Sequence, residues 1–137
     1  MKNVKIIECP RDAMQGIKTH FISTEDKANY INALLRVGFD TIDFGSFVSP
    51  KAIPQMRDTA AVLSQLDLSS TSSKLLAIIA NVRGANDAAQ FEEIDYLGYP
   101  FSISENFQMR NTHKTISQSI ETLQEILAIA TRSDKEV

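Results

Sequence analysis

Hydrophobic positions along this chain fall into four short runs, and a mostly polar or amphipathic stretch follows each run. The runs cover residues 4–7, 39–44, 75–80 and 94–99. Short apolar runs bounded by polar or turn residues are typical of buried strands. Strands that are apolar throughout are covered on both faces, which favours a parallel sheet with right-handed crossovers.

Between the runs, apolar positions recur at the three- and four-residue spacing of a helix. A first helix is predicted from Ser23, a typical N-cap with acids behind it, to Gly38, a typical C-terminal glycine. Further helices are predicted over residues 53–63, where a proline suits the first turn, and over 115–127, which begins with a capping box. A short helix is expected over 85–91.

The remaining segments are expected to be irregular. Residues 8–22 and 101–111 are expected to be loops, and the polar tail 131–137 is expected to be frayed. The order is thus a strand followed by a helix, four times over, in one domain of 137 residues. A complete (β/α)₈ barrel, or TIM barrel, needs roughly 250 residues. The sequence therefore predicts an α/β fold of four consecutive βα units, which is half of such a barrel.

Charge and composition narrow the possible partners. The net charge is −3 and the basic residues form no stripe, so nucleic-acid binding is not expected. The longest apolar run is far shorter than the roughly 20 residues that cross a bilayer, so no membrane segment is expected. Cys9 is the only cysteine, which excludes an internal disulfide. We interpret it as a small buried hydrophobe in a reducing, cytoplasmic setting.

Polar residues after the first two predicted strands carry the candidate chemistry. Arg11 and Asp12 come soon after the first strand, and Asp43 closes the second. Catalytic groups of parallel barrels collect at the carboxyl ends of the strands. Asp12 offers the oxygen ligand that Mg²⁺ and Mn²⁺ prefer, and Arg11 offers forked donors for an enolate or a carboxylate. Asp43 is a candidate to pair with Arg11, orient it and take part in proton transfer.

Each candidate also has an ordinary structural interpretation, and both interpretations stay open at this point. An adjacent Arg-Asp pair fits a surface ion pair or a turn, and an acid at a strand end often faces water. Ser46 could hydrogen-bond a substrate carboxylate or cap a turn. Asn81, at the end of the third strand, and Ser104, after the fourth, could line the same pocket or serve only their own loops.

Several of these residues belong to segments that resemble hydroxymethylglutaryl-CoA lyases. The segments are Pro-Arg-Asp-Ala-Met-Gln at 10–15, Thr-Ile-Asp at 41–43 and Ser-Phe-Val-Ser-Pro-Lys at 46–51, followed by Pro-Gln-Met at 54–56. The likeness covers most of the chain and is clearest between residues 4 and 58. The Arg-Asp element alone is shared with a wider group of metal-dependent barrel enzymes that includes isopropylmalate synthase.

The resemblance implies the N-terminal half of a TIM-barrel lyase that cleaves 3-hydroxy-3-methylglutaryl-CoA to acetyl-CoA and acetoacetate with a divalent metal. By analogy, Asp12 would be a metal ligand and Arg11 would stabilise the enolate of acetyl-CoA. Asp43 stands where the family usually has a glutamate that supports the arginine. The substrate pocket would be lined by Gln15 and Ser46 and, on looser matches, by Asn81 and Ser104.

The chain also departs from the family pattern. Cys9 and Ala13 stand where the family typically has glycine. The family's His-x-His metal ligands and its catalytic cysteine loop lie further along than this sequence extends. The resemblance therefore implies an incomplete metal site and an inactive isolated chain. We also expect self-association through exposed half-barrel edges. Two alternatives remain: a non-catalytic homo-oligomeric acyl-CoA-binding module, and a related Claisen- or aldol-type enzyme.

Overall fold

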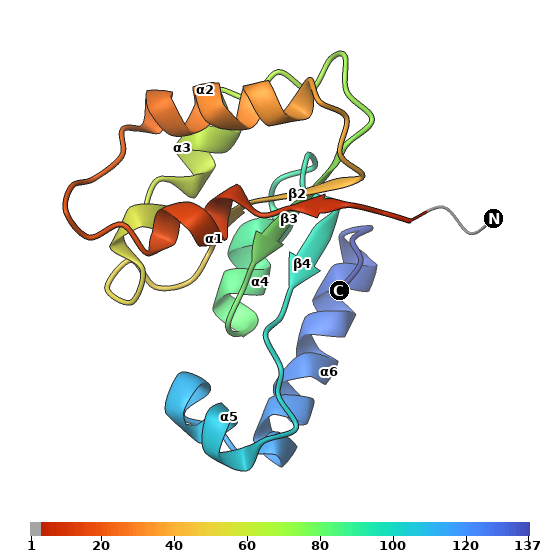
Figure 1. The fold of residues 1–137 in the computed structure, drawn as a ribbon. Helices are drawn as coiled ribbons and strands as arrows, with labels where there is room; N and C mark the ends of the chain where they lie inside the picture. Colours follow the sequence, from red (N-terminus) through yellow and green to blue (C-terminus); the bar gives the residue numbers. More distant parts are fainter. Residues whose placement is uncertain (1–3) are drawn as a thin grey trace.

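The computed structural model describes residues 4–137 and shows four parallel strands in a single sheet (Figure 1). Strands β1 (Ile7–Glu8), β2 (Thr41–Ser46), β3 (Lys74–Ile78) and β4 (Tyr96–Gly98) lie side by side in chain order. All three strand pairs are parallel. This arrangement confirms the predicted succession of βα units.

Helical segments follow every strand. They are α1 (Pro10–Gln15) and α2 (Thr24–Leu35) after β1, the 3₁₀ helix η1 (Pro54–Met56) and α3 (Thr59–Leu63) after β2, α4 (Val82–Ala89) after β3, and α5 (Glu105–Thr112) and α6 (Ile116–Arg132) after β4. Figure 1 shows α5 apart from the sheet, beyond the end of the chain segment that leaves β4.

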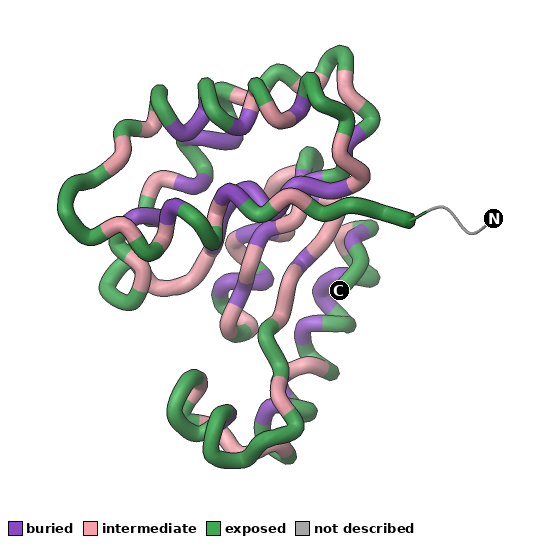
Figure 2. The backbone as a smooth tube through the Cα atoms, in the orientation of Figure 1, coloured by how far each residue is buried: buried purple, intermediate pink, exposed green. Residues whose placement is uncertain are grey.

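The hydrophobic core lies between one face of the sheet and the long helices. Its fully buried side chains include Ile31 of α2, Ile42 of β2, Leu75 of β3 and Ile126 of α6. Figure 2 shows this buried layer along the strands and along one side of the helices. The alternation of side chains along each strand sends these residues to the helix-covered face.

The opposite face of the sheet is only partly covered. Leu76 of β3 and Tyr96 of β4 are half-buried, and Ile7 of β1 is 53% exposed. A cavity of about 470 Å³ opens on this face, lined by residues of β1, β3 and β4 among others. In a closed barrel the equivalent side chains fill the interior.

A bulge interrupts β2 just after Asp43. Asp43 pairs with Leu76 and Gly45 pairs with Ala77, so the register shifts between Asp43 and Gly45. A Cβ on Gly45 would lie 2.5 Å from Cγ2 of Thr59, so only glycine lets this helix residue approach the strand. Asp43 is thus the third residue of β2 and does not close the strand as predicted, because the pairing resumes after the bulge and continues to Ser46.

The first strand is shorter and less buried than predicted. We expect a buried strand over 4–7, but β1 covers only Ile7–Glu8, and Val4 and Ile6 are 88% and 58% exposed. Within residues 4–137, β1 is an edge strand that pairs with β2 alone. The exposure follows from this edge position and from the partly covered inner face.

Two segments predicted to be loops contain helices. The segment 8–22 holds α1, which begins at Pro10 because proline suits the first position of a helix. The segment 101–111 holds most of α5, whose first turn is capped by the Ser104 hydroxyl. In both cases a helix shorter than ten residues lacks the repeated apolar stripe that the sequence pattern requires.

The boundaries of other helices also differ from the prediction. The helix predicted over 53–63 is divided into η1 and α3, and α2 ends at Leu35, before Gly38. Gly38 has a φ of +83° and forms the turn that leads to β2. The helix expected over 85–91 begins at Val82, because Asn81 caps it.

The C-terminal tail is held against the sheet and is not frayed as expected. Lys135 is 8% exposed, and its Nζ donates hydrogen bonds of 2.7 Å to the carbonyl oxygens of Phe91 and Ile94. Glu136 forms a parallel bridge with Tyr96 of β4. In the described part of the chain, no helix combines the length and apolar character needed to cross a bilayer.

Candidate active site

An ion pair joins the first turn of α1 to the neighbouring strand β2. Because α1 begins directly after β1, Arg11 lies at the carboxyl end of that strand. Its Nε donates hydrogen bonds to both carboxylate oxygens of Asp43, at 3.1 Å and 3.2 Å, and its Nη2 donates to Oδ2. The pairing expected from the sequence is therefore present, in the forked geometry that suits arginine and a carboxylate.

The pair is mostly buried, and burial acts on the pKa of both partners. Asp43 is 4% exposed, and the Arg11 side chain is 13% exposed. Burial raises the pKa of Asp43 above its ordinary value, although the bonds from Arg11 oppose the rise. Burial acts to lower the pKa of Arg11, but the hydrogen bonds and charge of Asp43 outweigh it and raise that pKa. Arg11 thus carries a permanent positive charge at this edge of the sheet.

Asp12 presents a second, exposed carboxylate beside the pair. Its Oδ1 accepts hydrogen bonds from Arg11 Nη1 at 3.2 Å and from Gln15 Nε2 at 2.7 Å. Gln15 reaches it because residues three apart share one face of a helix. The Asp12 side chain is 67% exposed, and its Oδ2 has no hydrogen-bond partner among residues 4–137. Asp12 can therefore offer one oxygen to a ligand.

Gln15 carries an unsatisfied polar atom. Its Oε1 is buried and has no hydrogen-bond partner within the described residues. A buried acceptor of this kind costs free energy unless a donor meets it. The amide therefore fits a contact with a ligand that carries an N–H or O–H group.

A metal site cannot be built from the described residues alone. Residues 4–137 contain no cluster of three or more His, Cys, Asp or Glu side chains that could hold a cation. Asp12 supplies one oxygen, while the carboxylate of Asp43 is occupied by Arg11. Divalent cations such as Mg²⁺ need several oxygen ligands, so this donor set does not fit a complete site.

Ser46 lies at the end of β2 and is 2% exposed. It pairs with Ile78 as Asp43 pairs with Leu76, so the strand register places Ser46 and Asp43 on the same face of the sheet. Its hydroxyl accepts a hydrogen bond of 3.2 Å from the Val48 backbone N–H. The hydroxyl proton remains able to reach a further acceptor.

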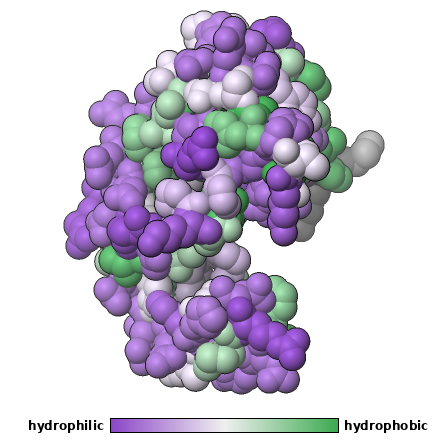
Figure 3. All heavy atoms as spheres, turned by 90° about the vertical axis from the view of Figure 1, so that its left-hand side faces the viewer, coloured by the Kyte–Doolittle hydropathy of each residue, from purple (hydrophilic) through white to green (hydrophobic). Residues whose placement is uncertain are grey.

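Asn81 and Ser104 serve as helix caps. The Asn81 side chain accepts a hydrogen bond of 2.9 Å from Gly84 N–H, and the Ser104 hydroxyl accepts one of 3.3 Å from Phe107 N–H. Neither hydrogen-bonds to the Arg11–Asp43 pair. Figure 3, viewed from the side of α1 and α5, shows a hollow between two parts of the molecule. The upper part holds the sheet with α1 and α2, and the lower part holds α5 and the start of α6.

Cys9 corrects one expectation from the sequence. We expect a buried side chain, but Cys9 is exposed at the N-cap of α1. It precedes the proline that starts the helix, so its side chain is left outside the core. The sequence pattern could not reveal this because the helix itself was not predicted.

Sequence reasoning also misses a buried polar cluster next to α1. Gln55 of η1 is 4% exposed and Lys27 of α2 is 2% exposed. Their type gives no hint of burial, because glutamine and lysine are mostly found on surfaces. The only sequence signal is the Pro-Gln-Met segment at 54–56, which belongs to the resemblance described above.

Comparison with curated proteins gives a consistent set of relatives. The chain is 35% identical over 126 residues to a hydroxymethylglutaryl-CoA lyase of Bacillus subtilis, covering 91% of this chain and 41% of that protein. It is 36% identical over 132 residues to the mitochondrial enzyme of Macaca fascicularis, covering 94% and 39%. A Pseudomonas aeruginosa lyase described as acting on 3-hydroxy-3-isohexenylglutaryl-CoA and hydroxymethylglutaryl-CoA is 32% identical over 130 residues. No protein-family model matches the chain.

Solved structures agree with the sequence comparison. The Bacillus subtilis lyase superimposes with a TM-score of 0.89 at 33% identity, covering 98% of this chain and 45% of that structure. A lyase of Acinetobacter baumannii, solved with coenzyme A and 3-methylmalate, gives 0.86 at 31% identity and covers 96% and 43%. The chain spans less than half the length of each of these relatives. It is a homologue of the hydroxymethylglutaryl-CoA lyases and has the fold of a half-barrel portion of them.

Proposed function

We propose that this chain carries part of the active site of a lyase that cleaves 3-hydroxy-3-methylglutaryl-CoA to acetyl-CoA and acetoacetate. One observation supports this above others. The Arg11 guanidinium, just after the carboxyl end of β1, is held by the buried carboxylate of Asp43 in the neighbouring strand β2, beside the exposed carboxylate of Asp12. Relatives with the same fold are carbon–carbon lyases.

In the proposed reaction, the bond between C2 and C3 of the substrate breaks. The 3-hydroxyl group loses its proton and becomes the ketone of acetoacetate. The electrons of the broken bond pass to the thioester as an enolate, which takes up a proton to give acetyl-CoA. Charge therefore develops on the thioester oxygen, and a fixed cation near that oxygen lowers the barrier.

Arg11 is the proposed catalytic residue for the enolate. A guanidinium has five N–H donors. Three of the N–H groups of Arg11 bond to Asp43 and Asp12, which leaves two donors for an oxyanion. Asp43 keeps the guanidinium charged and fixes its plane. Because the Asp43 carboxylate is fully engaged by Arg11, an orienting role fits it better than proton transfer.

Asp12 is proposed as one ligand of a divalent cation, Mg²⁺ or Mn²⁺, in the complete enzyme. When bound, such a cation polarises substrate oxygens. The described residues form no group of three or more side chains that could hold a cation, so further ligands would come from outside residues 4–137. On this basis the chain alone is inactive.

The substrate is proposed to be an acyl-CoA held beside Arg11 and Asp12, toward the carboxyl ends of β1 and β2. Gln15, with its buried unpartnered oxygen, and Ser46, with its free hydroxyl proton, are the proposed polar contacts. Asn81 and Ser104 are proposed as more distant lining residues through the amide and hydroxyl protons that capping leaves unused. A relative solved with coenzyme A supports this class of ligand.

We further propose that the isolated chain self-associates. Val4, Ile6 and Ile7 expose apolar side chains along the β1 edge, and the inner face of the sheet is only partly covered. Exposed apolar surface at a strand edge favours pairing with another chain.

A chimaera tests the proposed chemistry. This chain would replace the corresponding βα units of the Bacillus subtilis relative, with which it superimposes over 98% of its length. We expect metal-dependent cleavage of 3-hydroxy-3-methylglutaryl-CoA, and we expect Arg11→Met to lower turnover by about 10²–10³-fold while substrate binding is mostly kept. A folded chimaera whose turnover is unchanged by Arg11→Met would refute the role. The chain alone should show no activity.

A further inference from the structure

Gln55 is a buried side chain whose polar atoms are committed to one loop. Its Nε2 donates hydrogen bonds to the carbonyl oxygens of Ile17 and His20, at 2.9 Å and 2.6 Å. Its Oε1 accepts a hydrogen bond of 3.1 Å from the Ile22 backbone N–H. A single amide thus bonds to three backbone groups of the segment 16–22, which connects α1 to α2.

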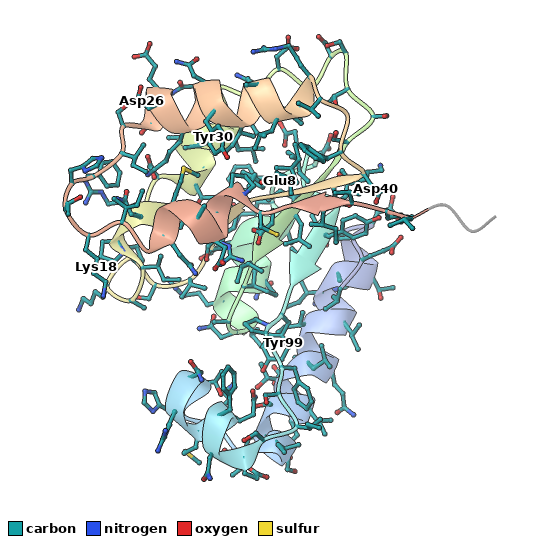
Figure 4. All side chains as sticks on the ribbon, viewed as in Figure 1. Glu8, Lys18, Asp26, Tyr30, Asp40 and Tyr99 are labelled. Atoms are coloured by element: carbon teal, nitrogen blue, oxygen red, sulfur yellow. The ribbon has the colours of Figure 1, made fainter. Side chains whose placement is uncertain are left out.

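The segment 16–22 has little else to hold it. Between residues 18 and 22 the structure gives no hydrogen bond from one backbone group to another. The side chains of the segment are exposed or half-buried, and Figure 4 shows Lys18 at its outer edge, directed away from the body. The loop therefore depends on side-chain anchors supplied by the neighbouring elements.

Lys27 of α2 holds the backbone of Gln55 in place. Its Nζ, which is buried, donates hydrogen bonds to the backbone oxygen of Gln55 and, at 2.6 Å, to Oδ1 of Asp58. The same Nζ lies 4.0 Å from the centre of the Phe21 ring, a favourable cation–π contact. Arg57 covers the same ring, with its Cζ at 3.8 Å from the centre. The loop is thus clamped to both η1 and α2.

The contacts of Gln55 and Lys27 with the segment 16–22 affect the candidate site through α1. Ile17, which Gln55 binds, lies two residues beyond Gln15, and Gln15 donates to the carboxylate of Asp12. Helices α1 and η1 also contact one another directly. We propose that Gln55 is a positioning residue that fixes the end of α1, and thereby the geometry of Gln15, Asp12 and Arg11. Its catalytic meaning rests on the function proposed above.

Nuclear magnetic resonance on this chain tests the assignment without any need for turnover. In the unaltered chain, the Gln55 side-chain amide protons should exchange with water at least tenfold more slowly than those of Gln124, which is exposed on α6. Gln55→Glu places a carboxylate against two carbonyl oxygens. We expect the backbone amides of Ile17 and Ile22, which have hydrogen-bond partners, to exchange about tenfold faster, and the Arg11 Nε–H and Gln15 side-chain signals to shift.

Gln124→Glu is the matched control, because it makes the same chemical change on an exposed helix face. It should leave all of these signals in place. If Gln55→Glu does not fold, Phe21→Leu loosens the same loop at a side chain that is 38% exposed, and the same Arg11 and Gln15 shifts are expected.

Three results would overturn the assignment. One is rapid exchange of the Gln55 side-chain amide in the unaltered chain. Another is faster exchange of the Ile17 and Ile22 amides with no change at Arg11 and Gln15, which would limit Gln55 to a local structural role. The third is a uniform rise in exchange across the whole chain, including α6. None of these readouts depends on lyase activity, so a failed chimaera would not decide them.

Discussion

At the scale of single residues, the pair formed by Arg11 and Asp43 combines burial with a forked contact. The carboxylate has left water, and the guanidinium replaces its lost hydration with hydrogen bonds. A buried pair of this kind is costly to break, because removal of one partner leaves a buried charge alone. The arrangement therefore fixes the direction in which the remaining Arg11 N–H groups can act.

The pKa of Asp43 gives a first prediction. Burial raises it above the ordinary 3.8, whereas hydrogen bonds from Ser69 lower the pKa of Asp67. In a carboxyl ¹³C titration, Asp43 should reach its midpoint at a higher pH than Asp67. Because folding raises this pKa, the stability linked to protonation of Asp43 is fully present below pH 3.8 and is lost as the pH rises through its folded-state pKa, while the contact between the ionised carboxylate and Arg11 remains. A midpoint for Asp43 at or below that of Asp67 would contradict the described burial.

The sequence was informative for residues whose chemistry comes from strand ends. Arg11 and Asp43 could be predicted to meet because they follow neighbouring parallel runs, although Asp43 lies inside β2, level with the end of β1, and not at the end of its own strand. The local roles of Asn81 and Ser104 could not be separated from site roles, since the same side chains also favour helix caps. Gln55 could not be recognised, because its partners are backbone groups of a distant loop.

At the scale of elements, close contacts between backbone segments decide how the strand ends are placed. Gly84 in the first turn of α4 lies against the segment that follows β2, and a Cβ at that position would lie 2.8 Å from the carbonyl oxygen of Phe47. That segment begins at Phe47, directly after Ser46, so α4 helps to position one side of the candidate site. Glycine is required there by close approach and not by backbone conformation.

A glycine-to-alanine comparison tests this contact. Alanine is the better helix former by about 1 kcal/mol, but Gly84→Ala forces the Phe47 backbone to move, and such overpacking typically costs about 1–3 kcal/mol. We expect Gly84→Ala to lower the melting temperature. Gly16→Ala is the matched control, because a Cβ there would meet nothing within 4 Å and should be neutral or slightly stabilising. Equal melting temperatures for the two variants would rule out the close contact.

Elements with strong periodicity were predictable, and short ones were not. Strands β2, β3 and β4 follow from short apolar runs, and the long helices α2 and α6 follow from apolar spacing over many residues. The first strand overlaps its predicted run only at Ile7. The short helices α1 and α5 depend on one proline and one serine cap, which a periodic pattern does not register. The tail was predicted to be frayed because it is polar, yet buried lysine bonds from Lys135 to two carbonyl groups hold it in place.

At the scale of the whole molecule, one face of the sheet is packed against helices and the other is not. Parallel sheets are normally covered on both faces. The relatives contain more than twice the aligned length, and in a closed barrel further strands would meet the β1 edge and the inner face. The half-barrel could be predicted from the count of βα units, whereas the exposure of β1 follows only from its edge position.

The exposed edge gives a prediction about assembly. We expect size-exclusion chromatography with light scattering to show that the chain associates with itself. Ile6→Lys adds a charge at the β1 edge, where Ile6 is 58% exposed, and should shift the population toward the monomer. Val37→Lys is the control, because Val37 is 66% exposed but lies outside the strands. A stable monomer for the unaltered chain would contradict the proposal.

The coupling energy between Arg11 and Asp43 is the most direct test of the proposed active site, because the roles proposed for both residues depend on their contact. It is measured by urea unfolding of Arg11→Met, Asp43→Asn and the double variant, at one protein concentration and pH 7. We expect a coupling of about 2 kcal/mol, as for charge-assisted hydrogen bonds. The exposed pair Lys5–Asp40, at 3.7 Å, should give less than about 1 kcal/mol in the same cycle. A coupling for Arg11 and Asp43 no larger than that of the exposed pair would contradict the site.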